Sequence, residues 1–514
     1  MKKISSLNFI LLFALYLLVV NFIFFNRVYT FLPDIEKFKI VPLILAGFSI
    51  CLLILSLLFV KFLTKPLSIL IALISGVCGY FMYAYGIVVD TEMIANAAQT
   101  DALEVKNLLN IKFFIWLFFF AILPTIFIVK IKIEYFSLLK ELKLRAILIA
   151  FALVSFGAVY ATFSKTYIPL FRKHADNIRP YTLPFYPIYS AVLFATDSLK
   201  TPPHFVSFKN NVLKDKEQNS LLVFIIGETQ RSANYSLNGY SKNETNLYTK
   251  NIENLVSFTT FYSCGTNTAV SLPCMLSDLD RKRFSRGEAK FRQNLIQILM
   301  EAGVDVYWFG NNSGGCKGVC DDLDESHKVE LKARGMDREI FNLAKDVKVK
   351  ERPTAIFLHI QGSHGPAYFK DYEVAKFKPT CDTADLSSCT SSQIVNTYDN
   401  SILYQDELQS DLIAHLKSFG DDKKIFFLFV SDHGESLGEN GLYLHSIPYA
   451  IAPDFQKRVP ALFWFNDAKM SGNFQTMKDS YHSHDNLFHT ILGFFKIESE
   501  AYDKNLDMFM SVKE

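Results

Sequence analysis

The chain of 514 residues lacks an excess of either charge, because 53 Lys and Arg residues are balanced by 51 Asp and Glu residues. A formal net charge of +2 argues against a nucleic-acid partner, which would require a strongly basic surface. Internal repeats and low-complexity segments are also lacking, which excludes a solenoid architecture. No small-residue cleavage site follows the first apolar run, so we expect this run to stay in the chain as a helix.

Apolar residues are abundant instead. They make up 50% of the chain, with Phe alone at 48 positions, and they are concentrated in the N-terminal third. Five apolar segments are long enough to cross a bilayer core, which takes about 20 helical residues. They cover roughly residues 8–25, 40–63, 66–89, 111–129 and 145–163. We therefore expect a multi-pass transmembrane domain at residues 1–165, followed by a globular domain.

The loops between these segments differ in charge. Basic residues gather at Lys2 and Lys3, at residues 61–65 and at residues 130–145, whereas the loop at residues 90–104 is acidic. Because basic loops tend to stay in the cytoplasm, the amino terminus is predicted to lie inside. Five spans then place the rest of the chain outside the cytoplasm.

A segment rich in aromatic, proline and basic residues follows the last span, at residues 166–215. This composition suits the membrane–water interface, where amphipathic rings and cationic side chains both find partners. A plain spacer is the alternative. The globular domain is expected at residues 216–514.

The eight cysteines fall into two groups. Cys51 and Cys78 lie in predicted spans, where a thiol acts as a small apolar side chain. The other six form close pairs: Cys264/Cys274, Cys316/Cys320 and Cys381/Cys389. Local disulfides are the simplest pairing, and they persist in oxidising compartments such as the periplasm. Reduced thiols or a zinc knuckle are the alternatives, but no second Cys/His pair lies near Cys316 and Cys320 to complete a zinc site.

Six apolar runs of the globular domain are predicted to be buried strands. They are residues 221–226, 256–262, 304–309, 355–360, 425–430 and 461–465. Helices are predicted at residues 289–302 and 395–419, each followed by a glycine, which is a common helix C-cap. Buried strands alternating with helices indicate an α/β domain with a mainly parallel sheet covered by helices.

Polar residues follow these strands where each one ends. Glu228 follows the first strand, and Asp432 and His433 follow the strand at 425–430. Ligands of open α/β sheets bind outside the carboxyl ends of the strands. Two carboxylates with an imidazole are the ligand set of a catalytic Zn²⁺ with one open position, and Mn²⁺ is the alternative metal. A turn with polar capping is the non-functional interpretation of residues 432–435.

Other polar residues are predicted to reach the same edge of the sheet. Asn311 and Asn312 follow one strand, His359 ends another, and His364 and His445 lie close behind strand ends. His484 is a candidate ligand or ligand-supporting residue, whereas His482 is expected at the surface.

Thr268 is the predicted nucleophile. It lies where the strand at 256–262 gives way to a predicted helix at 268–276, and a helix amino terminus favours a phosphoryl group. A neutral hydroxyl needs a base or a metal to attack, and a Cys264–Cys274 disulfide would fix the turn near that metal. The alternative nucleophiles are Thr266, Ser271 and Thr229. Together these residues indicate a metalloenzyme acting on phosphate or sulfate esters.

Longer motifs carry a family resemblance. They are IIGETQRSANYSLNGY at 225–240, CGTNTAVSLPCMLS at 264–277, HGP at 364–366, SDHGESLGENGLYLH at 431–445 and SHDNLFHT at 483–490. In these motifs, and in the five-span anchor, the chain resembles bacterial phosphoethanolamine transferases. These are inner-membrane enzymes of the alkaline phosphatase/sulfatase superfamily that decorate lipopolysaccharide.

The resemblance implies roles for individual residues. Glu228, Thr268, Asp432 and His433 would form the site of one tightly bound zinc ion, and His364 and His445 would bind a second zinc ion or the substrate's phosphate. The implied substrate-binding residues are Asn96, Thr100, Glu104, Asn312, Ser313, Lys317, His359 and His484. Asn96, Thr100 and Glu104 recur every four residues and would share one helix face toward a lipid head group, with a solvated face as the alternative.

The implied reaction moves phosphoethanolamine from phosphatidylethanolamine to Thr268 and then to lipid A, lipooligosaccharide or another periplasmic acceptor. A phosphoglycerol transferase would share this anchor and nucleophile, but the paired cysteines and the 431–441 motif favour ethanolamine. A sulfatase would need a Cys/Ser-x-Pro-x-Arg motif, and Thr268 is followed by Ala-Val-Ser. A non-enzymatic zinc-binding scaffold is the remaining alternative.

Overall fold

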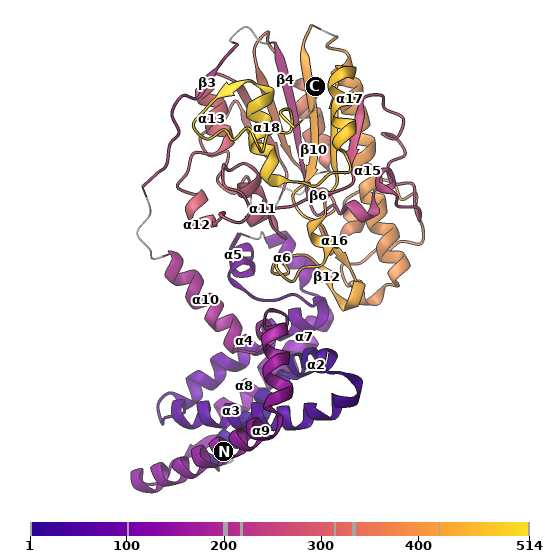
Figure 1. The fold of residues 1–514 in the computed structure, drawn as a ribbon. Coiled ribbons are helices and arrows are strands. Elements are labelled where there is room, and N and C mark those ends of the chain that lie inside the picture. The colour runs from indigo at the N-terminus through magenta and orange to yellow at the C-terminus, as the bar shows by residue number, and fades with distance from the viewer. Residues whose placement is uncertain are drawn as a thin grey trace. The chain divides into compact units, whose positions relative to one another are not determined.

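The computed structural model describes residues 3–99, 102–198, 204–215, 219–312, 315–331, 336–420 and 422–511. Contacts within the described chain divide it into two compact units. Unit 1 comprises Met1–Ile94 and Leu109–Thr196, and unit 2 comprises Ala95–Leu108 and Asp197–Glu514. Unit 1 holds the long apolar helices and unit 2 holds the central sheet (Figure 1).

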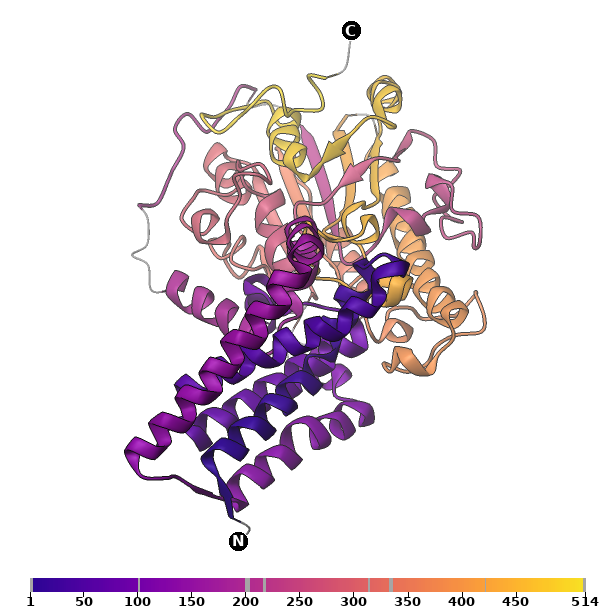
Figure 2. The ribbon, with the colours of Figure 1, turned by 60° about the horizontal axis from the view of Figure 1, so that its bottom comes forward.

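Unit 1 is built from helices, seen in the foreground of Figure 2. They are α1 (Ser6–Val20), α2 (Phe22–Phe31), α3 (Ile40–Leu58), α4 (Thr64–Tyr85), α7 (Ile111–Leu117), α8 (Leu123–Lys130), α9 (Leu138–Ile178) and α10 (Phe185–Ser198). Among the described residues, four helical segments are long and apolar enough to cross a membrane: Asp34–Leu58, Thr64–Tyr85, Ile111–Lys130 and Leu138–Tyr181. Helices α1 and α2 meet at a bend of 51°. The expected five spans are reached only if this bent pair counts as one.

Helix α9 is longer than the predicted last span at residues 145–163. It runs for 41 residues and enters the segment predicted as a linker, where α10 adds a second helix. Tyr167, Leu170 and Ile178 explain the extension, because they are buried and continue the apolar face of the helix. The segment after the last predicted span is therefore largely helical.

Close backbone approach holds part of unit 1 together. A Cβ on Gly76 of α4 would lie 2.7 Å from Cβ of Ala121, which belongs to the π-helical turn η2 (Phe118–Ile122). The Tyr16 hydroxyl donates to the carbonyl of Phe120 at 2.6 Å in the same turn. In lipid, burial of apolar surface adds little to helix association. Helices there associate through close packing at small residues and through hydrogen bonds between helices.

Unit 2 contains a seven-stranded sheet. Its strands lie in the order β5 (Leu255–Phe258), β13 (Ala461–Phe465), β10 (Lys424–Ser431), β4 (Ser220–Gly227), β9 (Thr354–His359), β7 (Asp305–Gly310) and β8 (Lys328–Glu330). Each neighbouring pair from β10 to β8 is parallel, and among the described strands of this sheet only β13 runs against its neighbours. The predicted mainly parallel α/β sheet is confirmed.

Both faces of the sheet are buried. Leu222, Phe224 and Ile226 of β4 face a large apolar core, whereas the alternate residues Val223 and Ile225 face the opposite side and are also inaccessible. Side chains of α11 (Thr268–Met275), α13 (Leu295–Ala302), α17 (Ala468–Met477) and α18 (Leu487–Phe494) complete the first core. Helix α14 (Asp337–Asp346) packs on β7 and β9 and on the 27-residue helix α15 (Ser391–Lys417).

Two predicted elements differ from the observed ones. The predicted strand at 256–262 is split into β5 and β6 (Phe261–Tyr262), and β6 leaves the main sheet to pair with β14 (His482–Ser483). The predicted helix at 289–302 begins only at Leu295, because the Asn294 side chain caps it in a capping box. The split strand leads the chain directly into the turn before Thr268.

Shorter elements complete the described chain. They are β1 (Lys3–Ser5), β2 (Lys132–Glu134), β3 (Val212–Leu213), β11 (Ser436–Leu437), β12 (Tyr443–Leu444), β15 (Ile497–Glu498), α5 (Thr91–Gln99), α6 (Ala102–Leu108), α12 (Arg286–Ala289) and α16 (Asp454–Lys457).

Phe426, near the start of β10, tests the apolar core beneath the sheet. It is fully buried, and its ring lies 4.5 Å from that of Phe465 and 5.4 Å from that of Phe494. We expect Phe426→Ala to lower the free energy of unfolding by about 3–5 kcal/mol, because the cavity cannot be filled. Phe426→Leu, which keeps more of the volume, should cost less than about 1.5 kcal/mol. Denaturant unfolding of the solubilised protein, followed by tryptophan fluorescence, measures both; equal losses would contradict this packing.

Candidate metal and nucleophile site

Four neighbouring parallel strands carry the polar residues of the site at their carboxyl ends. Glu228 follows β4, Asp432 and His433 follow β10, His359 ends β9 and Asn312 follows β7. Because β10, β4, β9 and β7 are adjacent and parallel, these residues emerge at one edge of the sheet. Glu228, Asp432 and His433 are all completely buried there.

The three predicted ligands lie together. Nε2 of His433 is 3.2 Å from Oε1 of Glu228 and 3.4 Å from Oδ2 of Asp432. One ligand atom from each residue lies within 4.8 Å of the other two. The other oxygen of Asp432, Oδ1, accepts from the backbone N–H groups of Thr229 and His433, which leaves Oδ2 directed at the imidazole.

The two facing oxygens fit a bound cation. Oε1 of Glu228 and Oδ2 of Asp432 are buried and accept no hydrogen bond from any described residue. A buried, unsatisfied carboxylate oxygen is costly, and two of them beside one imidazole nitrogen call for a positive charge. The residues present therefore fit a divalent metal bound by two oxygens and one nitrogen.

Thr268 is the hydroxyl that faces this cluster. It is the first residue of α11, after the N-cap Asn267, and its Oγ1 donates to Oε2 of Glu228 at 2.9 Å. The same oxygen lies 3.4 Å from Nε2 of His433. The alternative hydroxyls are hydrogen-bonded to backbone groups. Thr266 donates to the carbonyl of Ile447, Ser271 accepts from the N–H of Gly265, and Thr229 donates to the carbonyl of Glu228.

Asn312 fixes the orientation of Glu228. Its Nδ2 donates to Oε2 of Glu228 at 2.6 Å and to the carbonyl of Ile360 at 3.0 Å. Oε2 thus accepts from both Asn312 and Thr268, and Oε1 is left toward His433. An asparagine here acts on the carboxylate, in addition to any contact with substrate.

Two further histidines lie beside Glu228, Asp432 and His433, the triad of predicted ligands. The rings of His445 and His433 are 4.4 Å apart, and those of His445 and His364 are 5.4 Å apart. Nδ1 of His445 is 3.3 Å from Oε2 of Glu435, a fully buried carboxylate. His445 thus lies beside His433, and His364 lies beside His445, where two imidazoles could bind a second cation or a phosphate.

The charges of the triad shift its pKa values in opposite directions. Burial raises the pKa of Asp432, and the negative charge of Glu228 raises it further, to about 7. Burial would lower the pKa of His433, but the charges of Asp432 and Glu228 outweigh it and raise that pKa to about 10. Burial would raise the pKa of Glu228, but the close ion-pair contact with His433 and the charge of its imidazole hold that pKa below its ordinary value. Without a metal, His433 carries the positive charge of the cluster.

The other predicted substrate-binding residues are placed less uniformly. His359 is buried against Trp308, with ring centres 5.8 Å apart, and burial lowers its pKa to about 4. Lys317 lies inside the Cys316–Cys320 loop with a left-handed φ of 52°. Asn96 lies on α5, whereas Thr100, Ser313 and the side chain of Glu104 lie outside the described part of the chain.

His482 and His484 both lie away from the surface. His484 is completely buried and is hydrogen-bonded to the backbone of Cys264 and Ser431, in the segments that lead to Thr268 and to Asp432. His482 was expected at the surface, but only 8% of it is exposed, because β14 pairs with β6 and packs His482 against Phe258 and Phe261. Its short sequence context gave no sign of this pairing.

Two neighbours of the site are not revealed by sequence patterns. Glu435 belongs to the turn after His433, where an acidic residue is ordinary. Asp337 begins α14, yet its buried carboxylate accepts from the N–H groups of Gln361 and Gly362 at 2.9 Å each and from Asn311 at 2.7 Å. It therefore fixes the loop after β9 that leads to His364. A tertiary contact of this kind leaves no local signal.

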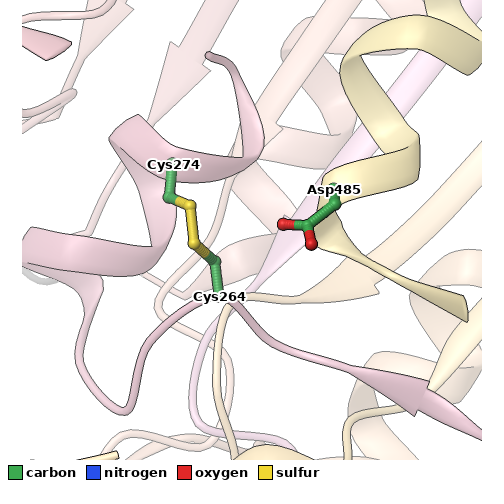
Figure 3. Close-up of side chains that lie close together, drawn as sticks. All are labelled: Cys264, Cys274 and Asp485. Atoms are coloured by element: carbon green, nitrogen blue, oxygen red, sulfur yellow. A yellow bond between two sulfur atoms is a disulfide. The ribbon is translucent and has the colours of Figure 1, made fainter. Parts of the chain in front are cut away.

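All three predicted disulfides are present: Cys264–Cys274, Cys316–Cys320 and Cys381–Cys389. Figure 3 shows the Cys264–Cys274 bond, with the carboxylate of Asp485 beside it. The bond joins the start of the turn at residues 264–268, called the nucleophile turn after the predicted role of Thr268, to α11. Asp485 lies close enough to both sulfurs to resemble a ligand group, but bonded sulfurs are not thiolates and do not bind zinc. The bond instead closes a loop around Thr268.

Comparison with known proteins gives the family. Residues 47–199 match the family model described as phosphoethanolamine transferase EptA/EptB, and residues 220–497 match the model described as sulfatase. The phosphoethanolamine transferase EptA of Escherichia coli K12 is 33% identical over 547 residues, covering 99% of this chain and 98% of the relative. The phosphatidylethanolamine transferase Mcr-1 of Escherichia coli is 33% identical and covers 93% of each chain. This chain belongs to the phosphoethanolamine transferase family.

Solved structures agree with this assignment. The integral membrane lipooligosaccharide phosphoethanolamine transferase A (EptA) of Neisseria meningitidis matches over 100% of both chains, with a TM-score of 0.92 and 30% identity. The C-terminal periplasmic domain of the phosphoethanolamine transferase EptC of Campylobacter jejuni is 46% identical, with a TM-score of 0.56, and covers 59% of this chain and 97% of that one. The predicted phosphoethanolamine transferase of the alkaline phosphatase/sulfatase superfamily is confirmed.

The pKa shifts predict how metal binding by this transferase depends on pH. A metal bound by these residues would displace the proton of His433, whose pKa is raised to about 10, and at lower pH also that of Asp432, whose pKa is raised by burial and by the charge of Glu228. Each displaced proton makes the affinity rise roughly tenfold per pH unit, so the zinc affinity should rise at least about 100-fold between pH 6 and pH 8. Competition with a chelator, corrected for the chelator's own titration, measures this. An affinity that is flat between pH 6 and pH 8 would contradict the assignment of these ligands.

Proposed function

We propose that this protein transfers phosphoethanolamine from phosphatidylethanolamine to lipid A or lipooligosaccharide through a covalent intermediate on Thr268, with zinc as its cofactor. The observation that carries the proposal is the Thr268 hydroxyl, 2.9 Å from Glu228 and 3.4 Å from His433, in a chain of the phosphoethanolamine transferase family. The catalytic unit is proposed to lie in the periplasm, with the apolar helices in the inner membrane.

The proposed metal ligands are Glu228, Asp432, His433 and the Thr268 oxygen. The unsatisfied oxygens of Glu228 and Asp432 support this set, and zinc accepts mixed oxygen and nitrogen ligands. When bound, zinc would lower the pKa of the threonine hydroxyl and stabilise negative charge on the phosphoryl oxygens. His364 and His445 are proposed to bind a second zinc ion or the phosphate itself.

In the first step, Thr268 Oγ1 attacks the phosphorus of phosphatidylethanolamine. A bond forms between Oγ1 and phosphorus, and the bond from phosphorus to the glycerol oxygen breaks, which releases diacylglycerol. The hydroxyl proton already points at Oε2 of Glu228. The leaving oxygen needs a proton, and His445 or His364 is placed beside the site to supply it.

In the second step, a phosphate or hydroxyl oxygen of the acceptor attacks the same phosphorus. The new ester bond forms as the bond from phosphorus to Oγ1 of Thr268 breaks. The acceptor's proton passes to the histidine that gave one up in the first step, and Oγ1 takes back the proton held by Glu228, which regenerates the threonine. The amino terminus of α11 presents backbone N–H groups to the phosphoryl group in both steps. Lipid A and lipooligosaccharide are favoured as acceptors because EptA of Neisseria meningitidis is named for lipooligosaccharide and matches the whole chain.

The membrane unit suits this chemistry. The proposed donor and acceptor are both lipids, so confinement to a membrane raises their effective concentration at the site. Addition of phosphoethanolamine brings an ammonium group to an anionic glycolipid, which would weaken its attraction for cationic peptides such as polymyxin. A sulfatase activity is disfavoured, since the nucleophile position holds a threonine followed by Ala269.

Trapping the intermediate tests the nucleophile. The wild-type protein incubated with phosphatidylethanolamine should carry one phosphoethanolamine unit on Thr268, visible by mass spectrometry of its peptides. Thr268→Ala should lose the adduct and lower transfer at least about 1,000-fold, because the group that attacks is gone. Thr266→Ala is the matched control and should keep the adduct. An adduct that persists in Thr268→Ala would exclude this residue, and a glycerophosphate adduct would indicate a phosphoglycerol transferase.

The acceptor is tested in cells. Mass spectrometry of envelope glycolipids should show a gain of one phosphoethanolamine unit on lipid A when the wild-type gene is expressed, and no gain with Thr268→Ala. A gain on a periplasmic glycan or protein, with lipid A unchanged, would replace the proposed acceptor while leaving the nucleophile in place.

A further inference from the structure

A buried histidine links the two halves of the site. His484 begins the short helix η9 (His484–Asn486) after β14 and is completely inaccessible. Its Nδ1 accepts from the backbone N–H of Cys264 at 3.1 Å, and its Nε2 donates to the backbone carbonyl of Ser431 at 3.0 Å. One imidazole therefore spans two segments that are far apart in the sequence.

Each contacted segment carries part of the reacting site. Cys264 begins the turn that ends at Thr268, and its disulfide to Cys274 joins that turn to α11. Ser431 is the last residue of β10 and directly precedes Asp432 and His433. The bridge therefore connects the nucleophile turn to the strand end that supplies two of the proposed ligands.

Neighbouring contacts hold the histidine in register. β14 pairs in parallel with β6, with His482 opposite Phe261 and Ser483 opposite Tyr262. Beyond the histidine, Oδ1 of Asp485 accepts from the backbone N–H of Arg281 at 2.8 Å, past the end of α11. The segment from β14 to Asp485 thus contacts the chain before α11, at Cys264, and after it, at Arg281. Figure 3 shows Asp485 beside the Cys264–Cys274 disulfide.

The two hydrogen bonds define the chemical state of the ring. An imidazole that accepts at Nδ1 and donates at Nε2 is a neutral tautomer. Burial lowers the pKa of His484 to about 3, in agreement with a neutral ring. Both nitrogens are already used by backbone groups, so neither is available to a metal.

We propose that His484 is a positioning residue that sets the distance between the Thr268 hydroxyl and the Asp432–His433 strand end, and that it is not a metal ligand. The inference rests on the proposed nucleophile and deepens it. A small shift of the turn would move the hydroxyl away from its attack geometry, and misplacement of about 1 Å can cost about 100-fold in rate.

Variants of His484 separate the two contacts. Asn places an oxygen near the position of Nδ1 and keeps the acceptor for Cys264, whereas Gln places an NH₂ group near Nε2 and keeps the donor to Ser431. Phe removes both bonds at similar volume. His482→Phe is the matched control, because His482 is a buried histidine of the same segment whose side chain makes one described hydrogen bond, to the Met477 carbonyl.

The full-length solubilised protein is used, loaded with zinc, and rates are expressed per folded, zinc-containing molecule. We expect His484→Phe to lower kcat about 10- to 100-fold with KM for phosphatidylethanolamine within about twofold, and to keep wild-type zinc content. His484→Asn and His484→Gln should fall between Phe and wild type. Hydrogen exchange should speed up at the Cys264 amide in His484→Phe and stay at the wild-type rate in His482→Phe.

Three results would overturn the proposal. Loss of zinc from folded His484→Phe would make the histidine a ligand. If folded His484→Phe kept the wild-type kcat, and the substitution lowered only the yield of folded protein, the histidine would be a purely structural part of the core. If His484→Phe does not fold, His484→Asn and His484→Gln carry the same test. Failure of the proposed function is distinguishable, because the amide-exchange result does not depend on any transfer reaction.

Discussion

Two buried carboxylates that face one imidazole are the interaction on which the rest of this structure depends. Glu228 and Asp432 end neighbouring strands, have no access to solvent, and direct one unsatisfied oxygen each toward His433. Two like charges at this distance are unfavourable without a compensating positive charge. A protonated His433 provides it in the absence of metal, and the proposed zinc ion would provide it more fully.

The surrounding fold can be understood as a means of holding that cluster together. Parallel pairing of β10 with β4 fixes the two carboxylates side by side, and Asn312 at the end of β7 selects which oxygen of Glu228 is left free. Thr268, the proposed nucleophile, is reached by a different part of the chain, through β6 and the turn closed by Cys264–Cys274. His484 is proposed to connect the end of β10 to the turn before Thr268. The site thus depends on contacts between segments that are 40 to more than 200 residues apart.

Much of the fold could be predicted from local patterns. Apolar strands such as β4 and β10 are continuous runs bounded by polar residues, and the order of strand, turn and ligand placed Glu228, Asp432, His433 and Thr268 at one edge. The residues alone favour Thr268 over Thr266 only weakly, because both are hydroxyls in one turn, and the family resemblance strengthens the preference. Only the folded chain shows that the Thr266 hydroxyl donates a hydrogen bond to the Ile447 carbonyl.

What could not be predicted follows from tertiary contacts. The pairing of β6 with β14 buries His482, which its exposed-looking neighbours Ser480 and Tyr481 do not indicate. Asp337 resembles any acidic residue in the first turn of a helix, yet it binds the loop after β9. Helix α9 extends past the apolar span because side chains far along the chain cover it. In each case the deciding partner is distant in sequence.

Anomalous diffraction at the zinc edge, from crystals of the full chain grown with zinc, tests the central claim most directly. The account predicts a strong peak about 2.0–2.2 Å from one oxygen each of Glu228 and Asp432, from Nε2 of His433 and from Oγ1 of Thr268. A zinc peak elsewhere, with these side chains turned away from one another and the site empty, would contradict it.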